Sequence, residues 1–284
     1  MSVKCTKKLT GQIIKYIHNT ESTMPILSYG TTLSASDCVN AVVNNGEIYY
    51  ASGVYYNNQI SDTYLWKCPR VDLSGSMADR IVDCNYKFVN GAIVSYNGKI
   101  HLLGSSDSSA KKYHRIVDVD NKTITSATAL PQNYSYAQAV VLDNKIHLFG
   151  GETYPKRHYT WDGSTWTLES TETPIDVDSI TKVIADNDGY LHIFRYLVHY
   201  KLVNGSWVQQ TDMPYSSNDV NTTIFKDSKI YIFNEYNYYV IDGSNSTQYD
   251  SPFRFHKSAS LLLNGNIVLL GGYYTEQMVY YLFE

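Results

Sequence analysis

Histidine recurs at one position of a repeated pattern, directly after an isoleucine or leucine that follows a polar turn. The stretches NGKIHLLG, DNKIHLFG and DGYLHIFR place His101, His147 and His192 at that position. Histidine is the commonest metal ligand in proteins and a frequent general base. Three histidines on one centre would indicate such chemistry, so the first question is whether the elements that carry them converge.

Other sets of residues that could carry out a reaction show no telling arrangement. Glycoside hydrolysis needs two carboxylates that face each other across one bond. The acidic residues of the variable segments are Asp62, Asp107, Glu152, Glu235 and Glu276, and their spacing indicates no such pair. No arginine triad is evident, and no glycine-rich phosphate loop leads from a strand into a helix. We assign no catalytic residue, no metal ligand and no cofactor, and the sequence favours a non-enzymatic protein.

The charge and the apolar content of the chain exclude some classes of partner. The formal net charge is −4, and no basic run is longer than Lys7-Lys8 or Lys111-Lys112, so phosphate-driven binding of nucleic acid is not expected. The stretch MSVKCTKKLTG lacks the apolar core of a signal peptide, and no stretch has the apolar length of a membrane span. We therefore expect no membrane insertion and a cytoplasmic or virion-associated protein, whose oligomeric state the sequence does not define. None of the four cysteines belongs to a C-x-x-C pair, which indicates free buried thiols.

The pattern around the histidines occurs six times along the chain. Each copy has an apolar run, a polar turn rich in Asn, Asp and Gly, and a second apolar run, as in VVLDNKIHLFGG. Asn-Gly and Asp-Gly between β-forming residues indicate two-residue hairpins, because such turns need positive φ. The first apolar residues after the turns are Ile48, Ile100, Ile146, Leu191, Ile230 and Ile267. They are 37 to 52 residues apart, a period typical of a solenoid or a propeller.

A second hairpin follows the first in each unit, most clearly in RHYTWDGSTWTLESTETP (157–174) and LVHYKLVNGSWVQQTDMP (197–214). Each unit therefore has four short antiparallel strands. One sheet of this size cannot bury both of its faces, but radial stacking of such sheets covers them. The sequence predicts an all-β fold, a six-bladed β-propeller in one domain (1–284). The blades are expected at 41–79, 91–129, 138–172, 181–212, 221–250 and 259–284.

The repeat resembles the kelch repeat of β-propellers over nearly the whole chain. The matching features are the double glycines Gly150-Gly151 and Gly271-Gly272, the fourth-strand tryptophans Trp166 and Trp207, and the closing dipeptides Leu130-Pro131 and Met213-Pro214. Some copies depart from the pattern. Arg195-Tyr196 and Asn234-Glu235 replace the glycine pair, and the first unit lacks a clear fourth strand between Leu73 and Asp79.

The two ends of the chain are expected to share the last blade. The sixth unit supplies its third strand in TEQMVYYLFE and then stops. The segment QIIKYIHNTESTMP (12–25) has the pattern of a missing fourth strand, so we expect a strand within residues 1–25 to pair with the C-terminal strand. Closure of this kind is common in kelch-like propellers, and it protects edges that would otherwise aggregate.

In a propeller the recurring histidines are not expected to form one site. Equivalent positions on successive blades are related by rotation about the axis, so His101, His147 and His192 are expected to pack far apart rather than to share a metal. TWDGSTW (160–166) resembles the Asp-box of sialidase-like propellers but is one residue short, and we expect an ordinary hairpin turn there. A copper-radical oxidase of the kelch class would need a tyrosine, a cysteine and two histidines near the axis, and no such set is evident.

The loops between the second and third strands, together with the loops between units, emerge on one face of a propeller. They are long in units one, two, three and six, and tyrosines crowd them; the chain has 27 tyrosines and 8 phenylalanines. Exposed aromatic clusters mark recognition sites, although these rings could instead cover one another between blades. The predicted ligand-binding residues of this loop face are Tyr55, Tyr56, Tyr134, Tyr136, Tyr154, Arg157, Tyr215, Tyr273 and Tyr274.

These features predict a recognition module that binds a glycan or a protein surface through its tyrosine-rich loop face. The bias toward Asn, Tyr, Ser and Lys resembles phage or low-GC bacterial proteins, which favours a surface-associated role. Two alternatives stay open. One is an intracellular kelch scaffold that docks a protein partner, although no BTB or F-box adaptor domain is present. The other is a kelch-type sugar epimerase or mutarotase, because a propeller fold alone does not decide function.

Overall fold

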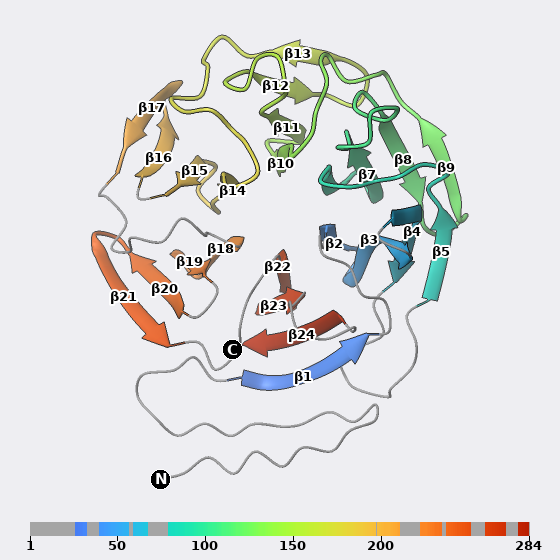
Figure 1. Cartoon of the computed structure of the whole chain (residues 1–284). Coiled ribbons are helices and arrows are strands. Elements are labelled where there is room, and N and C mark those ends of the chain that lie inside the picture. The colour runs from blue at the N-terminus through green and yellow to red at the C-terminus, as the bar shows by residue number, and fades with distance from the viewer. Residues whose placement is uncertain are drawn as a thin grey trace.

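The computed structural model describes residues 26–32, 40–56, 59–67, 79–196, 198–210, 222–234, 237–250, 259–270 and 278–283. All regular elements in these ranges are strands. The ribbon shows the sheets arranged around a central axis as a propeller (Figure 1). The expected all-β propeller is confirmed. Within the same ranges no helix could span a membrane.

The described strands form six four-stranded antiparallel sheets. The first sheet has β2 (Asn40–Asn44), β3 (Glu47–Tyr56), β4 (Gln59–Lys67) and β5 (Asp79–Asp83). The second has β6 (Ala92–Tyr96), β7 (Lys99–Leu103), β8 (His114–Asp118) and β9 (Thr123–Ser126). The third has β10 (Gln138–Leu142), β11 (Lys145–Phe149), β12 (His158–Trp161) and β13 (Trp166–Leu168).

The remaining sheets continue the same order around the ring (Figure 1). The fourth has β14 (Lys182–Ala185), β15 (Leu191–Arg195), β16 (Val198–Val203) and β17 (Ser206–Gln209). The fifth has β18 (Thr222–Lys226), β19 (Lys229–Phe233), β20 (Asn237–Asp242) and β21 (Asn245–Asp250). The sixth combines β22 (Ala259–Leu263), β23 (Asn266–Leu270) and β24 (Met278–Phe283) with β1 (Ile26–Thr32).

The hairpins between the first two strands of each sheet form at the predicted turns. Asn97 and Gly98 have φ of 50° and 72°, the left-handed conformation that a two-residue hairpin turn requires. Asp143 and Asn144 adopt the same conformation without a glycine, with φ of 49° and 54°. The short polar side chains of Asp and Asn tolerate this conformation, so the turn type is kept where the sequence varies.

The hydrophobic core lies between neighbouring sheets. Ile100 and Leu102 on β7 belong to a buried cluster with Leu65 of the first sheet. Leu103, the next residue, belongs to a cluster with Ile146 of the third sheet. Alternate side chains of a strand point to opposite faces, so each central sheet is covered on both sides by its neighbours. This packing makes radial stacking the source of stability.

The sixth sheet joins both ends of the described chain. β1 pairs with β24 in antiparallel register, with Tyr29 opposite Tyr281 and Thr32 opposite Met278. The pairing strand is Ile26–Thr32 and not part of 12–25, so the expected position is corrected. The Met24-Pro25 dipeptide precedes the strand instead of closing it, and residues 1–25 lie outside the described residues.

Two further local expectations are corrected in the first sheet. A fourth strand is present, β5 (Asp79–Asp83), and it pairs with β4 after the segment where none was evident. The long loop expected after β3 is largely a continuation of the β3–β4 hairpin, in which Tyr55 pairs with Ile60 and Tyr56 with Gln59. Hairpin pairing satisfies backbone groups that a loop of that length would leave to water.

Candidate functional site

Three loops on one side of the second and third sheets are joined into a single surface, called here the three-loop surface. They are residues 104–113, 127–137 and 150–157. Backbone hydrogen bonds connect all three: Ser105 N–H donates to Tyr134 C=O at 3.0 Å, Tyr134 N–H donates to Lys111 C=O at 2.9 Å, and Glu152 N–H donates to Asn133 C=O at 2.9 Å. The surface is therefore held by the backbone and does not depend on side chains alone.

Tyr154 is the most exposed of the predicted tyrosines on this surface, at 47%. The guanidinium carbon of Arg157 lies 3.6 Å from the centre of its ring. The Tyr154 N–H donates to Gln132 Oε1 at 3.0 Å, and Gln132 Nε2 donates to Tyr154 C=O at 3.2 Å and Gly150 C=O at 3.0 Å. Gln132 is itself buried, so both the backbone and the ring of Tyr154 are fixed before any ligand arrives.

Two other predicted tyrosines on the same surface have opposite environments. Tyr136 is 44% exposed, and its backbone has a φ of 57°. Tyr134 is completely buried against Leu103 and Leu148, so the prediction that it presents its ring to a ligand is wrong. Burial raises the pKa of its hydroxyl. Because Tyr134 closes the gap between two sheets, it supports the surface from beneath.

The three-loop surface also carries a charged group. Glu152 accepts hydrogen bonds from Lys111 Nζ and Ser135 Oγ, which lie on the other two loops. These two donors, Lys111 first, hold the pKa of Glu152 below its usual value. The carboxylate is therefore ionised at neutral pH, and these two hydrogen bonds hold it in place on the three-loop surface.

The other predicted tyrosines of the loop face do not belong to the three-loop surface. The backbones of Tyr55 and Tyr56 lie in β3. Tyr215, Tyr273 and Tyr274 lie outside the described residues. Of the predicted set, the structure places Tyr136, Tyr154 and Arg157 together on the three-loop surface.

Each recurring histidine is paired with a second histidine on the next strand. The Nδ1 atoms of His101, His147 and His192 lie 2.8, 2.9 and 2.8 Å from the Nε2 atoms of their partners. The partners, which the sequence reading missed, are His114, His158 and His199. Each begins the third strand of its sheet or lies one residue after that strand begins. The three pairs belong to three different sheets, and the residues described contain no group of three His, Cys, Asp or Glu side chains placed to hold a metal.

Burial keeps these imidazoles neutral. It lowers the pKa of His101 to about 4, with the Lys99 charge adding to the effect. It lowers the pKa of His114, His158 and His199 to about 3, where the partner histidine adds to the effect. In each neutral pair one ring donates and the other accepts.

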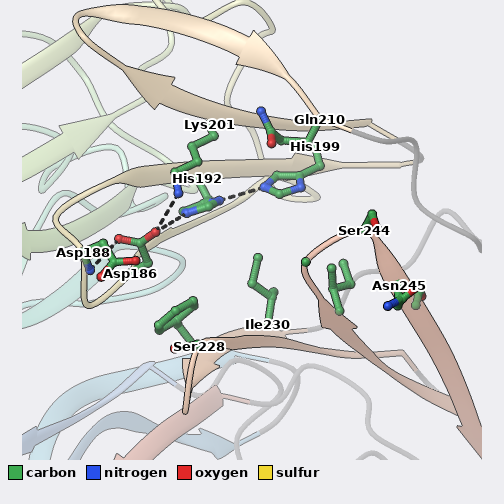
Figure 2. Close-up of a pocket in the computed structure, with 14 residues that line it drawn as sticks. Asp186, Asp188, His192, His199, Lys201, Gln210, Ser228, Ile230, Ser244 and Asn245 are labelled. Atoms are coloured by element: carbon green, nitrogen blue, oxygen red, sulfur yellow. Dashed lines mark hydrogen bonds and ion pairs between the residues drawn. The ribbon is translucent and has the colours of Figure 1, made fainter.

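The pair in the fourth sheet has charged neighbours. His192 Nε2 lies 3.0 Å from Asp186 Oδ2, and Lys201 Nζ lies 3.1 Å from the same oxygen. The other oxygen, Oδ1, accepts the N–H groups of Asp188 and Tyr190. Figure 2 shows the resulting chain from Lys201 through Asp186 and His192 to His199.

A crevice of about 380 Å³ opens beside this chain, between the fourth and fifth sheets. Asp186, His192, His199 and Lys201 form one wall. The facing wall, from the fifth sheet, has both apolar and polar residues: Phe225, Ile230, Ile241, Ser228, Gly243, Ser244, Asn245 and Ser246. Figure 2 shows His199 of the fourth sheet with Ser244 and Asn245 of the fifth sheet across from it. This crevice is the second candidate site.

Comparison with known proteins supports the fold. No family model and no curated protein sequence matches the chain. The solved structure of YjhT is similar, with 9% sequence identity over 88% of this chain and 94% of that chain and a TM-score of 0.71. A fungal alcohol oxidase of the AA5 family in complex with copper is similar at 13% identity over 88% of this chain and 61% of that chain, with a TM-score of 0.61. At these identities the likeness shows the fold alone, that of a β-propeller.

Proposed function

We propose that the chain is a kelch-like propeller whose six four-stranded sheets are its blades, and that it acts as a non-enzymatic recognition module for a glycan. The ligand binds on the three-loop surface. The observation that carries this proposal is Tyr154: its ring is half exposed although its backbone and one face are held by Gln132 and Arg157.

The geometry of Tyr154 suits a sugar ring. Tyrosine offers a flat apolar face and a hydroxyl at its edge, so it can stack on the C–H face of a sugar and bond its hydroxyls. Arg157 covers one face of the ring, which leaves the opposite face for a ligand. Because the ring is already ordered, binding loses little side-chain entropy, and preorganisation of this kind raises affinity.

Polar groups of the same three loops provide the hydrogen bonds that a glycan needs. Glu152 supplies a fixed carboxylate, and Lys111 and Arg157 supply donors from two different loops. Tyr136 adds a second exposed ring from the third loop. The compositional bias toward phage and bacterial surface proteins is consistent with recognition of a cell-surface glycan.

A glycan array probed with the purified chain tests the proposal. The wild-type protein is expected to bind a defined subset of glycans, and Tyr154→Ala is expected to weaken that binding about tenfold or more, as loss of a central aromatic contact does. Tyr196→Ala is the matched control, because Tyr196 is 40% exposed and has Arg195 over its ring at 5.0 Å but lies in the turn after β15 of the fourth sheet, outside the three-loop surface.

Melting temperatures of both variants close to that of the wild type establish that the fold is retained. Absence of any glycan binding, or equal losses in the two variants, contradicts the proposal. The chain could instead bind a protein in a way that free sugars do not inhibit but that Tyr154→Ala abolishes. That result would show that the surface recognises protein and not glycan.

A further inference from the structure

The crevice between the fourth and fifth sheets exists because one side chain of the repeat is missing. In the third sheet Trp166 lies opposite Trp161 across the outer hairpin, and in the fourth sheet Trp207 lies opposite Leu202 in the same register. In the fifth sheet the residue opposite Ile241 is Ser246. A serine thus occupies the position at which two preceding sheets carry an indole.

The two indoles fill the spaces between their own sheets and the preceding ones. Trp166 packs with the cluster between the second and third sheets, and its ring centre lies 5.5 Å from that of His114. Trp207 packs with the cluster between the third and fourth sheets, and its ring centre lies 6.5 Å from that of Phe149. Ser246 is exposed and too small to fill the corresponding space, which is why the crevice is open there.

The missing indole uncovers one histidine nitrogen. His114 and His199 occupy equivalent positions on the third strands of their sheets. His114 is paired with Leu103 and His199 with Phe194, each the last or second-to-last residue of the second strand. His114 Nδ1 is buried without a hydrogen-bond partner beneath Trp161 and Trp166. His199 is 6% exposed and lines the crevice, and no described residue forms a hydrogen bond to its Nδ1.

The charged neighbours determine what His199 Nδ1 can do. A carboxylate only accepts hydrogen bonds, so His192 donates to Asp186 from Nε2 and must accept at Nδ1. His199 therefore donates from Nε2, and its Nδ1 carries a lone pair. The positions equivalent to Asp186 are Tyr96 in the second sheet and Leu142 in the third. Of the three sheets that carry a histidine pair, only the fourth therefore has a carboxylate that fixes this tautomer.

We propose that this crevice binds a small planar heteroaromatic molecule whose ring N–H donates to His199 Nδ1. The repeat itself indicates the class of ligand, because an indole fills the corresponding space in the two preceding interfaces. Ile230, Ile241 and Phe225 provide apolar surface for the ring, and the polar lining residues Ser244, Asn245 and Ser246 accommodate substituents. This site is separate from the three-loop surface and does not depend on the function proposed for it.

Indole is the probe, and saturation-transfer difference NMR on the purified full chain at pH 7.5 is the measurement. We expect saturable binding with a dissociation constant of the order of 0.1–1 mM, as for a good ligand of this size. Benzothiophene has the same shape without the N–H group, and we expect it to bind several-fold more weakly. His199→Phe is expected to remove that difference between the two probes.

Ser246→Trp tests the location of the site. The new indole is expected to fill the crevice, abolish binding of free indole and raise the melting temperature. Thr247→Trp is the matched control, since Thr247 is the next residue of β21 and its side chain points to the other face. It should leave indole binding unchanged, as should Tyr154→Ala. Failure of the wild type to bind indole saturably, or equal binding by wild type and Ser246→Trp, would overturn the proposal.

Discussion

The Nδ1 atom of His147 lies 2.9 Å from the Nε2 atom of His158 on the neighbouring strand. The same contact recurs between His101 and His114. Rings packed in this way share one proton across the contact, and charging either ring would place a cation in a poorly hydrated space between packed sheets. The pairs therefore couple the stability of the propeller to pH.

Stability is expected to fall as pH decreases below 6.5. The pKa of His158 is about 3 in the folded chain and about 6.5 when unfolded, so between these values the unfolded state binds more protons. The stabilisation is complete above pH 6.5 and decreases as pH falls toward about 3. At pH 5 this ring alone lowers the free energy of unfolding by about 2 kcal/mol relative to its value well above pH 6.5. Urea unfolding at pH 8, 6.5 and 5 measures it.

A double variant isolates this contribution from that of the carboxylates. The equivalent positions in the fifth sheet hold Tyr231 and Tyr238, so His147→Tyr with His158→Tyr copies a pair that the fold already accepts. The loss of unfolding free energy between pH 8 and pH 5 should be smaller in this variant by about 2 kcal/mol or more. An identical pH profile in variant and wild type would rule out the histidine pair as its source.

Removal of β1 should destabilise the whole ring. A truncation of residues 1–32 leaves β24 with an unpaired edge, because β1 is the strand that pairs with it. We expect the melting temperature to fall by about 10 °C, and we expect aggregation, since the loss of one strand costs several kcal/mol. Differential scanning calorimetry with light scattering measures both. A truncation of residues 1–20 keeps β1 and should melt at a higher temperature than the longer truncation; equal melting of the two truncations would contradict the assignment.

A methyl group at Gly104 should be far more costly than one at Gly98. Both residues have positive φ, 69° and 72°, so Ala at either position costs about 1 kcal/mol in backbone strain. A Cβ at Gly104 would also lie 2.7 Å from the carbonyl oxygen and 2.8 Å from the Cβ of buried Tyr134, whereas one at Gly98 meets nothing within 4 Å. Gly104→Ala should lose about 3 kcal/mol or more in urea unfolding. Similar losses at both sites would show that the loop relaxes around the methyl group.

The arrangement of the strands was predictable because hairpin signals are local. Asn-Gly and Asp-Gly turns set both the number and the register of the first hairpins, and alternation set the faces. The position of β1 was not predictable from the sequence, because its pairing with β24 joins segments about 250 residues apart. No local signal shows whether residues 12–25 or residues 26–32 form the pairing strand.

The candidate sites were predictable only in part. Loop composition correctly indicated exposed rings at Tyr136 and Tyr154, but composition cannot separate these from Tyr134, whose burial depends on the gap between two sheets. The histidine partners were missed because pairing across strands follows register rather than sequence spacing. One signal of the crevice is readable in the sequence: aligned turns WDGSTW, LVNGSW and IDGSNS end in Trp, Trp and Ser.

Trp207→Ser should convert the interface between the third and fourth sheets into a copy of the crevice. Ser246 already shows that the fold tolerates serine at this register, so the variant should fold while losing the packing of the indole against Phe149. We expect a loss of about 2–4 kcal/mol in urea unfolding, the usual cost of a large side chain removed from a packed interface. Val208→Ser is the control on the same strand; Val208 is 46% exposed and points to the other face, so it should lose less than about 1 kcal/mol. Equal losses in the two variants would mean that Trp207 is not a filler of the inter-sheet space, and the explanation of the crevice by the missing indole would fail with it.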